Sequence, residues 1–160
     1  MNLLLVVILY NCTLLETGCS SCLGANLGTG FKCGWCDGNS VDTCRVSEEC
    51  LSPAQFVTSS ASCPAAQIVS VIPSSGPVEG GTTITITGTD LGVTYADIEN
   101  NVSIRSSPCI TRKNGYIPGT QIVCETTAFT SAPGSEDVIV TVRRGVGSYV
   151  ARGASLFTVM

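Results

Sequence analysis

The chain has 160 residues, which is enough for one ordinary domain or for one small and one medium domain. Its hydrophobic fraction of 44% is typical of a globular fold, while its charged fraction of 12% is about half of the usual ~25%. The net charge is −4, so the chain lacks the basic surface that nucleic-acid-binding proteins need. Histidine is absent, which excludes the usual general base and every mixed Cys/His zinc site.

Residues 1–10 are apolar, with an unbroken run from Leu3 to Leu9. A membrane-spanning helix needs about 20 apolar residues, so this run is too short to cross a bilayer. It is either an apolar leader, as in a signal peptide, or the terminal strand of a preceding domain. No basic residue precedes the run, no small-residue cleavage motif lies before Cys12, and the β-branched centre fits a buried strand. We therefore favour the strand over the leader.

The cysteines are the most informative residues. There are ten, and eight of them fall between Cys12 and Cys63. Such density is typical of segments that are too small to bury an adequate core and are stabilised by disulfides instead. The even number allows every thiol a partner, which indicates an oxidising compartment. The ten are Cys12, Cys19, Cys22, Cys33, Cys36, Cys44, Cys50, Cys63, Cys109 and Cys124.

Residues 11–64 form a cysteine-rich unit with many glycines, many small polar residues and little apolar periodicity. We predict a small, loop-rich, cysteine-knot-like module whose shape depends on cross-links. Its only tryptophan, Trp35, is expected to be the main apolar side chain of the small core.

Residues 65–160 have a different composition, with few cysteines and several alternating segments. Residues 83–87 alternate strictly, which predicts that Ile84 and Ile86 point inward and the threonines outward. Gly80-Gly81 predicts a turn, as does Ser75-Gly76-Pro77. Short strands, regular turns and no helical periodicity predict an all-β, immunoglobulin-like sandwich that begins after Pro64. Strands are expected at 67–72, 102–105, 121–126, 138–143 and 156–159, in addition to 83–87.

Two Cys-x-x-Cys pairs, Cys19/Cys22 and Cys33/Cys36, raise two chemical alternatives. A four-cysteine zinc site would leave the other cysteines of the unit unexplained, whereas a disulfide framework uses all eight. Cys33-Gly34-Trp35-Cys36 also resembles the motif of thiol oxidoreductases. That motif works at a helix N-terminus within a βαβ unit, and no such pattern surrounds it here.

The spacing of the charged residues matches no catalytic motif. The acids between Asp90 and Glu99 match no calcium-loop spacing, so we interpret them as an ordinary solvated loop. The basic pairs Arg112-Lys113 and Arg143-Arg144 are interpreted as solvated edge or loop charges. No catalytic residue, metal, cofactor or small-molecule substrate is expected, and the chain is not predicted to be an enzyme.

Two N-x-[ST] sequons are present, Asn11-Cys12-Thr13 and Asn101-Val102-Ser103. Each predicts a surface position for glycosylation in a secreted protein. The cysteine inside the first sequon can hinder modification, so Asn101 is the better candidate and Asn11 the weaker one.

These motifs carry a family resemblance. Residues from Leu9 to Cys63, with Cys33-Gly34-Trp35-Cys36 among flanking cysteines, resemble a plexin–semaphorin–integrin (PSI) domain. Residues 71–92, VIPSSGPVEGGTTITITGTDLG, resemble an IPT/TIG domain, which is an immunoglobulin-like module. The order of the two modules, and the sequence Tyr10-Asn11-Cys12 at the start of the first, are most similar to plexin receptor ectodomains.

The resemblance implies a disulfide pairing that the residues alone leave among 105 possibilities for the eight clustered cysteines. On the chain-entropy account each such bridge contributes roughly 2–4 kcal/mol. The implied pairs are Cys12–Cys33, Cys19–Cys63, Cys22–Cys44 and Cys36–Cys50 in the first module and Cys109–Cys124 in the second.

The resemblance also implies a role. We expect an extracellular stalk segment of a plexin-like cell-surface receptor that spaces and orients ligand-binding domains. Its partners would be neighbouring ectodomains, with a semaphorin-type ligand and the membrane reached only through segments outside these residues. The alternative is a free secreted protein that binds a receptor ectodomain. DNA binding, as in some IPT-containing transcription factors, conflicts with the acidic balance, and thiol-oxidoreductase activity with the context of Cys33 and Cys36.

Overall fold

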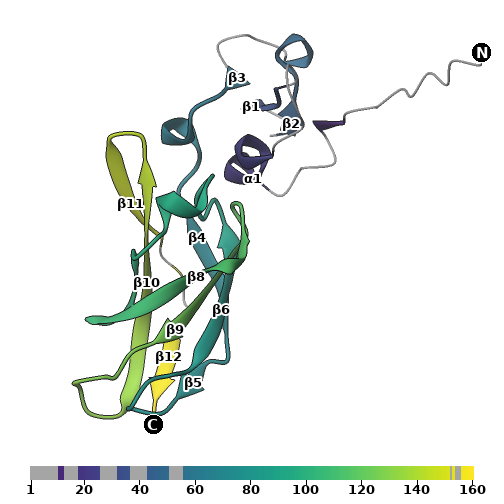
Figure 1. The fold of residues 1–160 in the computed structure, drawn as a ribbon. Coiled ribbons are helices and arrows are strands. Elements are labelled where there is room, and N and C mark those ends of the chain that lie inside the picture. Colours follow the sequence, from purple (N-terminus) through teal and green to yellow (C-terminus); the bar gives the residue numbers. More distant parts are fainter. Residues whose placement is uncertain are drawn as a thin grey trace, which may run out of the picture.

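The computed structural model describes residues 11–12, 18–25, 32–36, 43–50, 56–151, 153 and 156–160. The alternatives for residues 1–10 lie outside these residues. The described chain forms a small cysteine-rich module that stands on one end of an elongated β-sandwich (Figure 1). The C-terminus lies at the opposite end of the sandwich (Figure 1).

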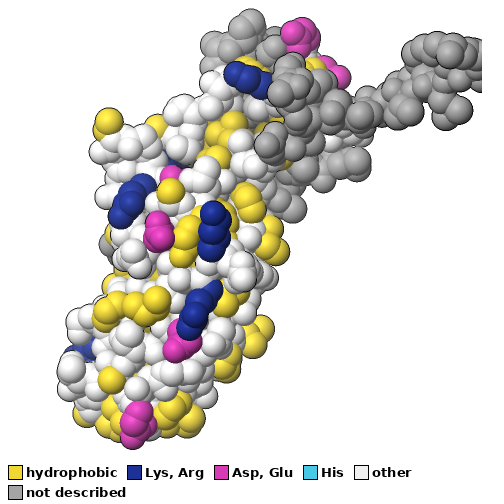
Figure 2. All heavy atoms as spheres, in the orientation of Figure 1, with side chains coloured by type: hydrophobic (Ala, Val, Ile, Leu, Met, Phe, Trp, Pro, Cys, Tyr) yellow, Lys and Arg dark blue, Asp and Glu magenta, His cyan; other side chains and the backbone are white. Residues whose placement is uncertain are grey.

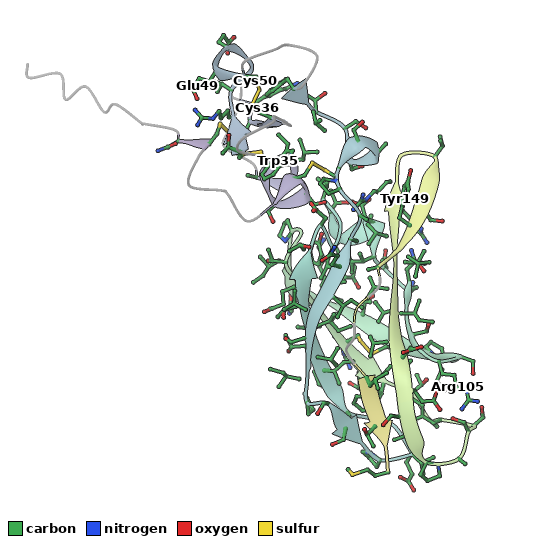
Figure 3. All side chains as sticks on the ribbon, turned by 180° about the vertical axis from the view of Figure 1, so that it is seen from behind. Trp35, Cys36, Glu49, Cys50, Arg105 and Tyr149 are labelled. Carbon is green, nitrogen blue, oxygen red and sulfur yellow. A yellow bond between two sulfur atoms is a disulfide. The ribbon has the colours of Figure 1, made fainter. Side chains whose placement is uncertain are left out.

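The N-terminal module contains one short helix and three short strands. Its elements are α1 (Cys19–Gly24), β1 (Gly34–Cys36), β2 (Thr43–Arg45), η2 (Ser47–Glu49), β3 (Phe56–Val57) and η4 (Ser60–Ser62). Strand β1 is central and pairs antiparallel with β2 and β3, so that Trp35 lies opposite Cys44 and Val57. Trp35 is 7% exposed and packs in a cluster of buried cysteines, as expected for the main apolar side chain of a small core (Figure 3).

The sandwich is built from nine strands in the described part of the chain. They are β4 (Gln67–Ile72), β5 (Ser75–Gly76), β6 (Thr83–Thr89), β7 (Val102–Ile104), β8 (Ser107–Ile117), β9 (Gln121–Thr126), β10 (Gly134–Arg144), β11 (Gly147–Ala151) and β12 (Leu156–Val159), with the short helix η5 (Tyr95–Asp97) between β6 and β7. The order is β4-β6-β9-β8-β7-β10-β12-β5, and β11 pairs with β10. Strand β8 connects the two layers because it pairs with β9 along most of its length and with β7 at its start.

The core lies between the layers and follows the alternation seen in the sequence. Ile84 and Ile86 of β6 are fully buried, and so are Ile122 of β9, Val140 of β10 and Phe157 of β12. The threonines of β6 face the other way, and Thr87 hydrogen-bonds Ser70 of β4 across the outer surface at 2.6 Å. The predicted fold class, a disulfide-rich module followed by an immunoglobulin-like sandwich, is confirmed.

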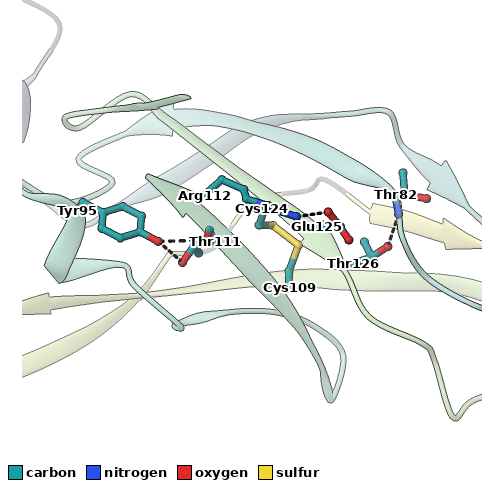
Figure 4. A network of polar contacts seen from close by, with 8 residues as sticks. All are labelled: Thr82, Tyr95, Cys109, Thr111, Arg112, Cys124, Glu125 and Thr126. Atoms are coloured by element: carbon teal, nitrogen blue, oxygen red, sulfur yellow. Dashed lines mark hydrogen bonds and ion pairs between the residues drawn. A yellow bond between two sulfur atoms is a disulfide. The ribbon is translucent and has the colours of Figure 1, made fainter. Parts of the chain in front are cut away.

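Polar contacts fix the β8–β9 region of the sandwich (Figure 4). The hydroxyl of Tyr95 lies 3.0 Å from Oγ1 of Thr111 and donates to its carbonyl at 3.1 Å. The backbone N–H of Thr82 donates to Oγ1 of Thr126 at 3.0 Å, and Arg112 forms an ion pair with Glu125 on the outer surface. Helix η5 is thereby tied to β8.

Several sequence-based expectations need correction. The cysteine-rich unit contains a helix, α1, which is too short to show periodicity and is fixed by bridges at Cys19 and Cys22. Ser75-Gly76, expected in a turn, forms β5 and pairs with β12. The sequence pattern does not predict strands β8 and β11, because β8 has a register shift after Arg112 and β11 is largely exposed.

Candidate functional site

Several polar contacts, most of them buried or half-buried, gather at the junction between the two modules. Two loops of the sandwich, residues 90–93 after β6 and residues 118–120 between β8 and β9, form the surface on which α1 rests. The loops hold each other, because Leu91 N–H donates to Gly119 O at 3.0 Å and Gly119 N–H donates to Gly92 O at 2.8 Å. They therefore present a fixed platform to α1.

Tyr116 stabilises this platform through a hydrogen bond to its backbone. Its hydroxyl donates to Gly92 O at 2.8 Å, and its ring packs edge-on against Tyr95. Burial, and secondly the negative charge of Asp97, raise the pKa of Tyr116 above its ordinary value. The hydroxyl therefore keeps its proton and remains a donor. The carboxylate of Asp97 accepts from the N–H groups of Val93 and Thr94, both at 2.9 Å, so this acid caps a loop.

Asp90 completes helix α1 from the other module. The N-cap residue of α1 is Gly18, which has no side chain that could accept from the free N–H groups of the first turn. Oδ1 of Asp90 accepts from Ser20 N–H at 2.8 Å, 70 residues away in sequence. That is the bond an N-cap side chain normally makes, and a carboxylate there also suits the helix dipole.

Two glycines allow the modules to approach closely, one on each side of the junction. A Cβ on Gly24 of α1 would lie 2.7 Å from Val93 O and 2.8 Å from Pro118 Cβ. A Cβ on Gly119 would lie 2.7 Å from Ser21 N. In the space that the missing Cβ atoms leave, the hydroxyl of Ser21 donates to Pro118 O at 2.9 Å. The helix thus touches the platform backbone directly.

Arg144, the last residue of β10, ties the connecting segment to the platform. The residue is 2% exposed, and its guanidinium donates from Nη1 to Cys63 O at 2.9 Å and from Nη2 to Asp90 O at 3.1 Å. The guanidinium also lies over the ring of Tyr149, 5.3 Å from its centroid. Burial lowers the pKa of Arg144, while Asp90 and then Tyr149 oppose this shift. Because a guanidinium is not deprotonated in proteins, Arg144 stays charged.

These contacts close a ring across the junction. From Ser20 the ring passes through Cys19, its disulfide to Cys63, the carbonyl of Cys63, Arg144 and Asp90, and returns to Ser20. The links from Ser20 to Cys19 and from Cys19 to Cys63 are covalent, and the other three are hydrogen bonds to buried groups. The connection from Cys63 to β4 is short, and Ala66 within it is already part of the sandwich core.

The interpretation of Arg143-Arg144 as a solvated pair is wrong for Arg144. Arg143 is exposed, but Val138, Val140, Val142 and Arg144 share the inward face of β10. The period of two along the strand contains the signal that could have identified Arg144. The interpretation of the acids between Asp90 and Glu99 as a solvated loop is likewise wrong for Asp90, which is buried. The role of Asp90 has no comparable sequence signal, because the group that it caps is distant in sequence.

The ten cysteines form five disulfides and none is free. Cys33 and Cys36 belong to different bridges, as do Cys19 and Cys22, so neither Cys-x-x-Cys pair is a dithiol or a set of zinc thiolates. The pairs formed are those that the family resemblance implies, and this pairing in the secreted protein stays a prediction. The bridges are Cys12–Cys33, Cys19–Cys63, Cys22–Cys44, Cys36–Cys50 and Cys109–Cys124.

Among the described residues, one group of potential metal ligands comes together, formed by Cys19, Cys63 and Asp90. The two sulfur atoms are bonded to each other, so neither is a thiolate. The carboxylate is already an acceptor for Ser20. The arrangement is a structural contact and offers no metal-binding chemistry.

Comparison with known proteins decides the family. The family model described as IPT/TIG domain matches residues 66–158. The chain belongs to the IPT/TIG family. Its IPT/TIG domain comprises the whole sandwich from β4 to β12 and carries Asp90 and Arg144.

The same chain resembles plexins over most of its length. It is 36% identical to plexin-A4 of Mus musculus over 123 residues, which is 74% of this chain and 6% of the relative. It is 40% identical to plexin-B3 of Homo sapiens (76% and 6%) and 37% identical to plexin-2 of Caenorhabditis elegans (64% and 5%). The chain thus spans only about one twentieth of the length of these relatives.

A solved structure shows the same architecture. The full extracellular region of plexin A4 superimposes with a TM-score of 0.75 and 32% identity over 94% of this chain and 15% of that chain. A second structure of that region gives a TM-score of 0.72. The chain is therefore a plexin-like extracellular receptor module, and these matches point away from an enzyme. Within the described residues, no helix has the length and apolar character needed to cross a membrane.

The two sequons lie in different settings. Asn101 directly precedes β7 of the IPT/TIG domain and is half-buried. Asn11 is exposed, but the middle residue of its sequon, Cys12, is buried and bonded to Cys33. Thr13 of that sequon lies outside the described residues.

Proposed function

We propose that this chain is a stalk segment of a plexin-like cell-surface receptor, in which two modules form one spacer. Residues 11–64 would be the PSI domain and residues 65–160 the IPT/TIG domain. The function is mechanical: the pair spaces and orients the ligand-binding domains of the receptor. Its direct partners would be the neighbouring ectodomains, and a semaphorin-type ligand would be bound by other parts of the receptor.

The observation that carries this proposal is the closed ring of contacts at the junction. Flexible joints between domains have exposed linkers that few contacts cross. Here the groups that bridge the modules are buried: Ser20 is fully buried, Arg144 is 2% exposed and Asp90 is 6% exposed. Bending at the junction would separate the carbonyl of Cys63 from the guanidinium of Arg144 and the N–H of Ser20 from the carboxylate of Asp90. Each of these groups that stays buried without a partner costs roughly 1–3 kcal/mol.

The surface agrees with an interaction module. On the face drawn in Figure 2, lysines, arginines and acidic side chains are scattered singly or in pairs among apolar and uncharged polar groups. A basic stripe of the kind that nucleic acid requires is not seen on that face, in keeping with the net charge of −4.

Small-angle X-ray scattering of the secreted, disulfide-bonded chain tests the spacer role. We expect the wild-type profile to fit one elongated arrangement of the modules. The double variant D90A/R144M, which removes all three hydrogen bonds of the ring and leaves all cysteines in place, should scatter as a broader set of arrangements.

The matched control is D137A/R143M, which changes the same residue types at exposed positions of β10. It should scatter like the wild type. The spacer role is refuted if the wild type already fits only a broad set of arrangements, or if D90A/R144M cannot be distinguished from the control.

A further inference from the structure

The sequon at Asn101 begins directly before β7, and its two essential residues, Asn101 and Ser103, are half-buried. Val102 and Ile104 of β7 are 2% and 1% exposed, so they point into the core. Because side chains alternate along a strand, Asn101 and Ser103 point to the outer face. The asparagine and the hydroxyl residue of the sequon therefore share one accessible surface.

The backbone of Asn101 is fixed while its side chain is available. Asn101 N–H donates to Ile98 O at 3.1 Å, and Asn101 O accepts from Thr141 N–H at 2.8 Å. The carboxamide makes no hydrogen bond with any other described residue. The backbone of Asn101 is thus fixed by hydrogen bonds, while its half-buried carboxamide does not stabilise the fold.

Open hollows flank Asn101 on both sides. One, of about 300 Å³, is lined by Thr141, Arg143 and the turn at residues 145–148. The other, of about 280 Å³, is lined by Ser103, Ser106 and Pro108 among others. The lining groups are small, and several carry hydroxyls or, in Arg143, a guanidinium that can hydrogen-bond sugar hydroxyls. A first sugar residue on Asn101 has room without any change in the fold.

We propose that Asn101 carries an N-linked glycan. The donor would be an oligosaccharide on a lipid pyrophosphate in the secretory pathway. Nδ2 of Asn101 forms the bond to the anomeric carbon and loses one proton, while the bond from that carbon to the pyrophosphate oxygen breaks and lipid pyrophosphate leaves with the electron pair. The sugar would cover Val146, a fully exposed apolar side chain in the lining of the larger hollow.

The same reasoning does not extend to Asn11, because the buried and bonded Cys12 holds the centre of its sequon inside the module. The glycosylation of Asn101 does not rest on the spacer role and requires only that the chain enters the secretory pathway.

The test is mass analysis of the chain secreted by a eukaryotic cell. We expect the wild-type peptide that contains Asn101 to carry a glycan, and an amidase that cleaves N-glycans to remove it and leave aspartate. N101Q and S103A should abolish the glycan on the secreted chain, whereas S103T should keep it, since threonine also completes the sequon.

N100Q is the neighbouring control, because Asn100 is followed by no hydroxyl residue at the required spacing, and it should keep the glycan. The proposal is overturned if the secreted, disulfide-bonded wild type has unmodified Asn101. It is also overturned if the only glycan survives in N101Q and disappears in N11Q. Analysis of the wild-type peptide decides the matter even where a variant is not secreted.

Discussion

Arg144 illustrates how one buried charge can connect three parts of a chain. It reaches the connecting segment through Cys63 O, the platform through Asp90 O and the β10–β11 hairpin through the ring of Tyr149. A guanidinium suits this position because its planar donors can serve two carbonyls at once while its face rests on an aromatic ring. Lysine offers a charge but no such fork.

The first prediction concerns this residue. R144M keeps an inward-pointing chain of similar length and leaves two buried carbonyls unpaired, which should lower the free energy of unfolding by about 1–3 kcal/mol for each carbonyl that finds no other partner. R143M changes the exposed neighbour and should stay within ~0.5 kcal/mol of the wild type. Denaturant titration of the oxidised chain measures both. Equal free energies of unfolding for R144M and R143M would show that the contacts of Arg144 do not stabilise the chain.

At the scale of elements, the platform loops and α1 depend on each other. The helix has six residues and lacks a side-chain cap of its own, so it relies on the bridges at Cys19 and Cys22 and on Asp90 from the sandwich. The loops in turn are shaped by residues with positive φ, namely Asp90 at +56°, Gly92 at +92° and Gly119 at +72°. Neither part of this contact is a regular element that could form alone.

The second prediction separates backbone strain from packing at this contact. G119A and G81A both place a Cβ at positive φ, at a cost of roughly 1–2 kcal/mol. Only G119A also drives that Cβ into Ser21, because nothing lies within 4 Å of a Cβ on Gly81. We expect G119A to be the more destabilising by roughly 1–3 kcal/mol and to speed hydrogen exchange of the α1 amides. Similar exchange in both variants would show that α1 does not rest on Gly119.

The elements of the sandwich that the sequence predicts are those with strong local signals. Ile84 and Ile86 alternate with threonines, and 67–72, 121–126 and 156–159 coincide with β4, β9 and β12. Strand β8 has no such signal, because residues 112–116 interrupt its alternation, with Gly115 at φ +105°. The junction could be predicted only in part. Arg144 continues the inward period of β10, but the capping of Ser20 by Asp90 depends on tertiary proximity that no local pattern encodes.

At the scale of the whole molecule, we propose that the cysteine-rich module and the sandwich behave as one body. The cysteine-rich module has a small core around Trp35, and the sandwich supplies the larger one. The Cys19–Cys63 bridge brings the covalent framework of the first module to the connecting segment, where Arg144 and Asp90 of the second module bind it. Relative motion of domains is the usual expectation for small interfaces, so rigidity here requires direct proof.

Residual dipolar couplings of backbone amides in the weakly aligned, oxidised chain give that proof most directly. If the ring at the junction holds, the couplings from α1 and β1 and those from the sandwich strands will fit a single alignment tensor with the orientation in Figure 1. Two tensors of clearly different magnitude for the two modules in the wild-type chain would contradict the account, because they would mean that the modules reorient independently.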